Sequence, residues 1–184
     1  MDLFVQTSEL IRSHNSVEPR QSFYLGHTQF SDMSRYEKAA FFGSRVLSPL
    51  PQEENYTPLE DNFENSKDWR AEGAVGPIRN EYAPLICQAC WAFAVTATLE
   101  AAHFIQSGEL LEFSPQQLVD CDSGSLGCKG GYVETAIDYV KTNAIMLEKD
   151  YPYVALDEAC RSDAAKSTGI NVIERFNVQP NDVH

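Results

Sequence analysis

The sequence predicts an α+β protein that is mainly helical and places its strand late in the chain. Three observations lead to this fold class. Apolar residues recur at helical spacing in several segments up to about residue 142, and residues 170–178 alternate in the manner of a strand. A stretch rich in proline and acidic residues separates the first helical segments from the rest.

Residues 1–43 are expected to form a small helical unit. Its first helix is indicated by apolar and small polar residues at helical spacing: Phe4, Thr7, Ile11 and Asn15. A capping box from Ser34 to Glu37 opens a second helix, which Gly43 ends. Residues 44–61 then form a linker with a glycosylation sequon at Asn55, and a site for proteolytic maturation is expected between about residues 56 and 64.

Residues 62–184 are expected to hold three helices before the strand at 170–178. The first runs from Cys90 to about Gln106, and apolar residues surround most of it, so it should be buried. The second opens at Ser114, where Gln117 completes a capping box. The third is indicated by apolar residues at helical spacing: Val133, Ala136, Ile137 and Val140.

The charge of the chain excludes some classes of partner. Its net charge of −13 repels phosphate backbones and anionic membrane surfaces, so neither nucleic acid nor a membrane is an expected partner. No apolar run approaches the ~18–20 residues of a membrane span, and the first residues do not read as a signal peptide. No motif points to a cofactor or a metal. A zinc site is disfavoured because no second close ligand pair accompanies Cys87 and Cys90.

The most informative local pattern is the run Cys87-Gln88-Ala89-Cys90-Trp91-Ala92-Phe93 at the head of a predicted helix. A thiol attacks as the thiolate, and the N-terminus of a helix stabilises negative charge there. A different interpretation makes Cys87 and Cys90 a dithiol redox pair, although such pairs follow a strand and this one follows a loop. The chain has 5 cysteines, so at least one is left unpaired by any set of disulfides.

Five motifs that follow one another along the chain resemble the papain family of cysteine peptidases. They are Asp68-Trp69-Arg70, Cys90-Trp91-Ala92-Phe93, Ser114 to Cys121, Gly127-Cys128-Lys129-Gly130-Gly131 and Tyr151-Pro152-Tyr153. Two earlier patterns, the Phe4–Asn15 spacing and Gly26-His27-Thr28-Gln29-Phe30-Ser31-Asp32, are similar to the signatures of a cathepsin propeptide.

The resemblance implies an architecture and a set of site residues. Residues 1–43 would be a propeptide, 44–61 a linker, and 62–184 the N-terminal part of a papain-like domain. That part comprises the helical left lobe and only the start of the β-rich right lobe. The implied residues are Cys90 as nucleophile, Gly130 and Gly131 as the strip that pairs with an extended peptide, and Tyr132 and Val133 in a substrate pocket. The implied disulfides are Cys87–Cys128 and Cys121–Cys160, in a lysosomal or extracellular protein.

Departures from the family pattern predict that this chain alone is inactive. The family's oxyanion-hole Gln falls on Glu81 or Pro84, depending on the direction of counting, and an ionised Glu would repel the developing charge. Gln88 stands where the family has a glycine. The family's base His and orienting Asn come roughly 130–150 residues after the nucleophile, beyond His184.

None of the four histidines is expected to serve as the base. His103 follows Cys90 along the same helix by about 20 Å, whereas His14 and His27 belong to the propeptide-like unit. The alternative function is a non-catalytic pseudoenzyme or a propeptide-like inhibitor of cysteine peptidases. Peptides or proteins are the expected substrates of a complete version, and a protein partner could bind the face between the lobes.

Overall fold

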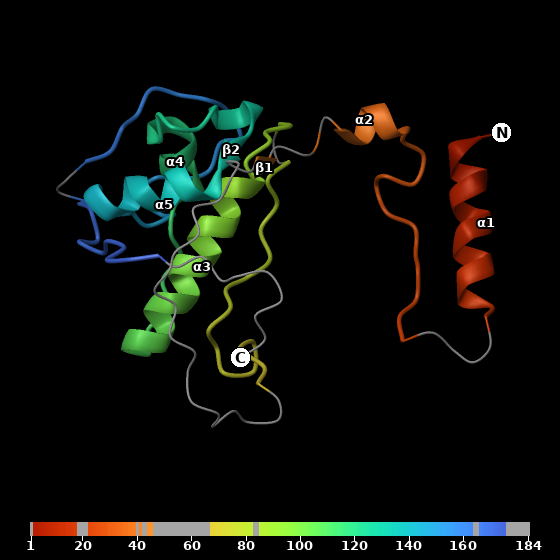
Figure 1. Ribbon diagram of the computed structural model, residues 1–184, viewed down its shortest axis with the longest axis horizontal. Coiled ribbons are helices and arrows are strands. Elements are labelled where there is room, and N and C mark those ends of the chain that lie inside the picture. Colours follow the sequence, from red (N-terminus) through yellow and green to blue (C-terminus); the bar gives the residue numbers. More distant parts are fainter. Residues whose placement is uncertain are drawn as a thin grey trace, which may run out of the picture. The chain divides into compact units, whose positions relative to one another are not determined.

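The computed structural model describes residues 2–17, 22–39, 41, 44–45, 67–82, 85–163 and 166–175. The chain divides into two compact units, Met1–Phe42 and Gly43–His184. Figure 1 shows the elements of each. The predicted cleavage region, the sequon at Asn55 and Pro84 lie outside the described residues.

The first unit contains α1 (Leu3–Asn15) and α2 (Arg35–Ala39). The Phe4 backbone N–H donates to Asp2 Oδ1 at 3.0 Å and caps α1. At the end of α1, the Asn15 side chain bonds the backbone of Leu25 twice, at 2.9 Å each, and so holds the returning segment. The capping box predicted before α2 is confirmed, because Ser34 N–H donates to Glu37 Oε2 at 2.7 Å and Glu37 N–H donates to Ser34 Oγ at 3.3 Å.

The second unit is built around the long helix α3 (Cys90–Ser107). Helices α4 (Pro115–Cys121) and α5 (Val133–Thr142) lie on one side of α3 (Figure 1). The helix α3 ends at Gly108, which adopts a left-handed conformation with φ 78° that glycine reaches without strain. A short 3-10 helix, η1 (Gly127–Lys129), joins α4 to a two-stranded parallel sheet of β1 (Ser44–Arg45) and β2 (Gly131–Tyr132).

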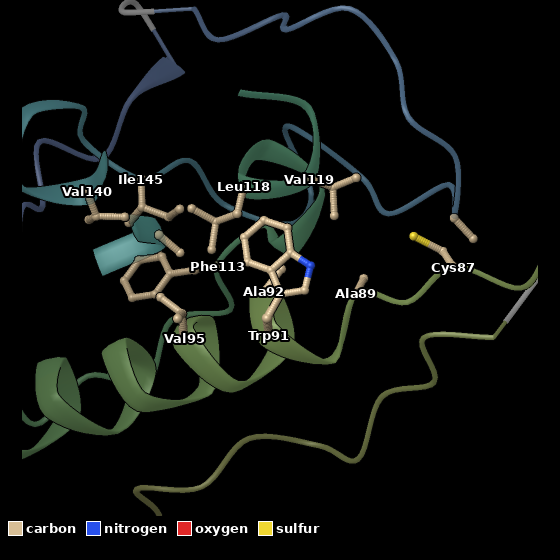
Figure 2. Packing of buried hydrophobic residues seen from close by; sticks show 12 residues of the cluster. Cys87, Ala89, Trp91, Ala92, Val95, Phe113, Leu118, Val119, Val140 and Ile145 are labelled. Carbon is tan, nitrogen blue, oxygen red and sulfur yellow. The ribbon is translucent and has the colours of Figure 1, made fainter. Parts of the chain in front are cut away.

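The core of this unit lies where α3, α4 and α5 meet. Trp91 and Val95 of α3 pack with Phe113, which precedes α4, and all three side chains are buried. Figure 2 shows these residues pointing toward a shared interior with further apolar side chains, Leu118, Val119, Val140 and Ile145. Burial of large apolar groups is the main stabilising contribution to such a layer.

The predicted capping box at the start of α4 forms only in part. Ser114 Oγ accepts the Gln117 N–H at 3.0 Å, as expected of a cap. The Ser114 N–H donates to the carbonyl of Met146 instead of to Gln117. The Gln117 side chain is buried and accepts the Met146 N–H at 2.6 Å, so it ties α4 to the segment after α5.

Two expectations from the sequence are wrong in the described residues. The strand predicted at 170–178 is irregular over 170–175, because its backbone bonds single groups, Ile145 N–H and the Val140 carbonyl, instead of a neighbouring strand. The helix α3 was expected to be buried on nearly all sides, yet Ile105 is 57% exposed and one face is open to solvent. Among the described residues, no helix is long and apolar enough to cross a membrane.

Candidate active site

Cys90 is the first residue of α3 and is half-buried. Ala89 precedes it as the N-cap residue, and its carbonyl accepts the N–H groups of Ala92 at 2.8 Å and Phe93 at 3.1 Å. The N–H groups of the first turn of an α-helix have no partner within the helix and favour negative charge beside them. The position therefore suits a thiolate nucleophile.

The segment before Cys90 is held by a disulfide. Cys87 is bonded to Cys128, and the Gln88 N–H donates to the Cys128 carbonyl at 3.1 Å. A second disulfide joins Cys121 to Cys160, which leaves Cys90 as the free cysteine of the chain. This is the pairing that the family resemblance implied. It contradicts the redox interpretation, since Cys87 has another partner than Cys90.

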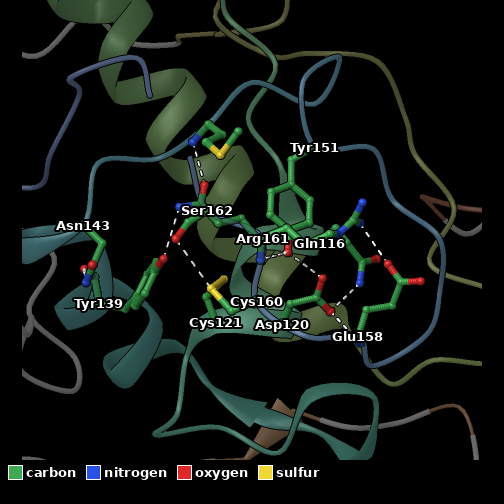
Figure 3. The surroundings of a disulfide bond; sticks show 12 residues. Gln116, Asp120, Cys121, Tyr139, Asn143, Tyr151, Glu158, Cys160, Arg161 and Ser162 are labelled. Atoms are coloured by element: carbon green, nitrogen blue, oxygen red, sulfur yellow. Dashed lines mark hydrogen bonds and ion pairs between the residues drawn. A yellow bond between two sulfur atoms is a disulfide. The ribbon is translucent and has the colours of Figure 1, made fainter. Parts of the chain in front are cut away.

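The Cys121–Cys160 disulfide lies within a network of polar side chains (Figure 3). Asp120 Oδ2 accepts the Tyr151 hydroxyl at 2.7 Å, and its Oδ1 accepts the Glu158 N–H at 2.9 Å. The Arg161 guanidinium lies 4.7 Å from the centre of the Tyr151 ring. The network and the disulfide together fasten the segment after α5 to α4.

The predicted substrate strip, Gly130 and Gly131, passes beside Trp91 in the first turn of α3. The Trp91 indole Nε1–H donates to the Gly127 carbonyl at 3.3 Å, and a Cβ on Gly131 would overlap the indole ring. Only a glycine therefore permits this approach of backbone to ring. The Tyr132 N–H donates to Ser125 Oγ at 3.1 Å, so the strip is also fixed from its other side.

Part of the strip is paired with the chain itself. Strand β1 runs parallel to β2, with Ser44 opposite Gly131 and Arg45 opposite Tyr132. The linker predicted at 44–61 thus begins with a short strand. No pattern in a two-residue segment could have indicated it.

Glu81 is the site residue whose role the sequence left open. Burial raises the pKa of its carboxyl group, against the opposing effect of hydrogen bonds from the Tyr82 hydroxyl and from the backbone N–H groups of Ala89 and Cys90. Its Oε2 atom is buried without a hydrogen-bond partner in the described residues. The carboxyl group therefore lies close to the first N–H groups of α3.

Glu81 is supported from the opposite side by Tyr153. The Tyr153 hydroxyl donates to the Glu81 backbone carbonyl at 2.8 Å, and its ring packs edge-on against Phe93 at 4.8 Å between centres. Burial, followed by the charges of Glu81 and Glu148, raises the pKa of Tyr153. The phenol therefore stays protonated and keeps its hydrogen bond at neutral pH.

Cys90 and Glu81 line one end of an open hollow of about 810 Å³ along the exposed face of α3. The other residues around it are mainly apolar, among them Val75, Ile78 and Ile105. Arg79 and Glu100 also line the hollow, where the Arg79 guanidinium bonds the buried Glu100 at 2.8 Å, and the same Glu100 Oε1 accepts the Phe113 N–H at 2.9 Å. This pair fastens the segment before the site to α3.

The histidines that the structure describes make contacts that do not involve Cys90. His103 lies 13 positions after Cys90 within α3, about 20 Å along the axis, where it packs against Phe113. In the first unit, His14 lies within hydrogen-bond distance of the Phe23 carbonyl and His27 stacks on Phe4. His184 lies outside the described residues.

Residues 63–184 match the family model described as papain family cysteine protease. Papaya proteinase 4 of Carica papaya is 36% identical over 168 residues, which cover 84% of this chain and 46% of that protein. The chain spans about half the length of the curated relatives it matches.

Solved structures agree with the sequence relatives. Digestive procathepsin L2 from Tenebrio molitor superposes with a TM-score of 0.75 at 30% identity, covering 90% of this chain and 56% of that one. A cysteine protease of Carica candamarcensis in complex with E-64 gives a TM-score of 0.53 at 39% identity, covering 60% and 49%.

Proposed function

Because this chain belongs to the papain family of cysteine proteases, we propose that Cys90 is its nucleophile for peptide-bond hydrolysis and that this chain alone does not complete the reaction. The observation that carries the proposal is a free thiol at the first position of an 18-residue helix, beside a cysteine that is locked in a disulfide. The thiolate attacks the peptide carbonyl, the amine leaves, and water releases the acyl group from sulfur.

The substrate class is an extended peptide or protein segment. Gly130 and Gly131 offer backbone groups for pairing, and Tyr132 and Val133 are half-buried beside them, where they would line a side-chain pocket. The packing of Gly131 against Trp91 supports this role, because it holds the strip at the head of α3 next to Cys90.

The precursor organisation is also a proposal: a propeptide at 1–43, a linker at 44–61 and the peptidase part from 62 onward. Pairing of β1 with β2 supports it, because a strand already on the strip competes with a substrate for the same backbone groups. The two disulfides and the family membership support a secretory route to a lysosomal or extracellular site.

The open face of α3 is proposed as a protein contact. Ile78 is fully exposed and Ile105 is 57% exposed, and both line the apolar hollow. Contiguous exposed apolar surface of this kind favours association with another protein surface. The expected partner is a second protein part that completes the site.

Two measurements on the full chain test the proposed function. We expect no measurable hydrolysis of a fluorogenic peptide amide, because His103, the histidine that the structure describes in this unit, is too far away to protonate the leaving amine. We expect E-64, which the Carica candamarcensis relative binds, to form one adduct at Cys90 and none in Cys90→Ser.

Other outcomes would decide against this proposal. Cys90-dependent hydrolysis of the amide would contradict the predicted inactivity. Equal E-64 labelling of the parent and of Cys90→Ser would contradict the role of the thiol. Inhibition of an active relative by the chain, without any Cys90 adduct, would favour the inhibitor or pseudoenzyme function.

A further inference from the structure

The carboxyl group of Glu81 occupies a position with a direct chemical consequence. It lines the same hollow as Cys90, and the backbone N–H groups of Ala89 and Cys90 at the start of α3 lie close enough to lower its pKa. The Cys90 N–H is the donor nearest the sulfur, so an oxygen that becomes negative during attack by Cys90 needs the same group. An ionised Glu81 and such an oxygen therefore compete for one donor, and their charges repel.

The surroundings of Glu81 favour its neutral form. Glu81 is half-buried, its Oε2 atom has no hydrogen-bond partner in the described residues, and burial raises the pKa of the carboxyl group. Its titratable neighbours are Tyr82 on its own segment, the Cys90 thiol on α3, and Tyr153 after α5. The pKa values of both tyrosines are raised, so neither supplies a competing negative charge.

Among the described residues, no cation contributes to the pKa shift of Glu81. Arg79 lies on the same segment, but its guanidinium bonds Glu100 at 2.8 Å and faces the Phe93 ring at 5.4 Å. Glu148 is a second buried carboxyl group near Tyr153 and accepts the Tyr153 N–H at 2.9 Å. Glu148 is not among the groups that shift the pKa of Glu81, although its own pKa is also raised by burial.

We propose that Glu81 is an oxyanion-hole residue that works only when protonated. As a carboxylate it binds the Cys90 N–H and excludes the oxyanion; as a carboxylic acid it donates its O–H hydrogen to the oxygen of the adduct formed on Cys90. This inference rests on the proposed function and deepens it, because it makes the formation of an adduct on Cys90 dependent on the protonation of Glu81. It also revises the expectation that Glu81 only repels the developing charge.

A peptide aldehyde isolates this step. The Cys90 sulfur bonds to the carbonyl carbon, the C=O double bond becomes a single bond, the thiol proton ends on the oxygen, and nothing leaves. The equilibrium therefore needs no base and no leaving-group acid. The tetrahedral carbon and its oxygen resemble those formed during hydrolysis.

The experiment uses the full chain and N-acetyl-phenylalanyl-glycinal with a ¹³C-labelled carbonyl, observed by NMR from pH 8 to pH 4.5. For the parent we expect binding at Cys90 to tighten about 10-fold or more as the pH falls, since one oxyanion donor contributes a factor of this order or larger. Glu81→Gln should bind tightly across the range, and Glu81→Ala weakly throughout. Glu148→Gln is the matched control, and its profile should follow the parent.

A second readout does not depend on the aldehyde. The Cys90 backbone amide resonance of the parent should titrate with a midpoint above the ordinary value for glutamate, about 4.3, and should stay constant in Glu81→Gln. Parallel pH profiles for the parent and Glu81→Gln, or a Cys90 amide that does not titrate in the parent, would overturn the inference. If adducts form at Cys90 with a pH dependence that is the same in the parent and in the Glu81 variants, the inference alone is refuted. If no adduct forms in any variant, the proposed function is refuted as well.

Discussion

Removing the carboxylate of Glu100 should destabilise the second unit more than any exposed ion pair does. Glu100 is 3% exposed, and its Oε1 accepts both the Arg79 guanidinium and the Phe113 N–H. Glu100→Ala leaves an uncompensated charge and an unpaired N–H in the interior, which typically costs about 3–5 kcal/mol. The exposed pair of Arg161 and Glu158 is the matched control, and Glu158→Ala should cost less than about 1 kcal/mol.

The loss of stability caused by Arg79→Met should change with pH in the opposite direction to the loss caused by Glu100→Ala. Burial raises the pKa of Glu100 in the folded chain, so the stability that this group contributes is fully present at low pH and is lost as the pH rises through the folded pKa. Without Arg79 that pKa rises further, because the charge and the hydrogen bond of Arg79 hold it down. The loss caused by Arg79→Met therefore grows with pH, and the loss caused by Glu100→Ala shrinks.

Urea unfolding between pH 4.5 and 8 under oxidising conditions measures both losses. A Trp69→Phe background leaves the buried Trp91 as the single tryptophan and as the fluorescence probe. A loss below about 1 kcal/mol for Glu100→Ala at every pH would refute the reasoning, as it would equal the cost of an exposed pair. Slopes of the same sign for Glu100→Ala and Arg79→Met would refute it as well.

Three further outcomes follow from the same packing. Alkylation of the native oxidised chain with iodoacetamide, followed by mass mapping, should modify Cys90 alone; a second modified cysteine would contradict the disulfide pairing. Gly131→Ala should lower the free energy of unfolding by about 1–3 kcal/mol, because its methyl group overlaps the Trp91 ring; an unchanged urea midpoint would show that the strip can move away. In sedimentation at micromolar concentration the chain should self-associate, and Ile78→Lys should reduce this, whereas Leu126→Lys, exposed but outside the hollow, should not; equal effects would exclude the open face as the contact.

Helices were the predictable part of this fold because their signals are local. The spacing of apolar residues and a reciprocal cap were enough for α1 and α2, and the helix predicted from Cys90 to about Gln106 matches α3, which ends at Ser107. The prediction of a strand at 170–178 was wrong because alternating apolar residues indicate only that a segment has two different faces. A strand also needs a neighbour, and Ile170 and Val172 bond the segments at Ile145 and Val140 instead.

The candidate site was predictable as far as its residue types carried the chemistry. The cysteine spacing and the glycine pair predicted Cys90 and the strip, but the segment before Cys87 could be counted in two ways, ending on Glu81 or on Pro84. Only the fold shows that Glu81 and Cys90 line one hollow. Its raised pKa depends on burial by residues distant in sequence, such as Tyr153, and no local pattern contains that information.

Acylation by an activated ester tests the central role of Cys90 most directly. With N-benzyloxycarbonylglycine p-nitrophenyl ester, the sulfur–acyl bond forms as the ester C–O bond breaks, and p-nitrophenolate leaves without needing a proton from the protein. We predict release of one equivalent of p-nitrophenolate per chain, a thioester mass at Cys90, and neither in Cys90→Ser. Acylation of another residue, or equal release from the parent and Cys90→Ser, would contradict the account.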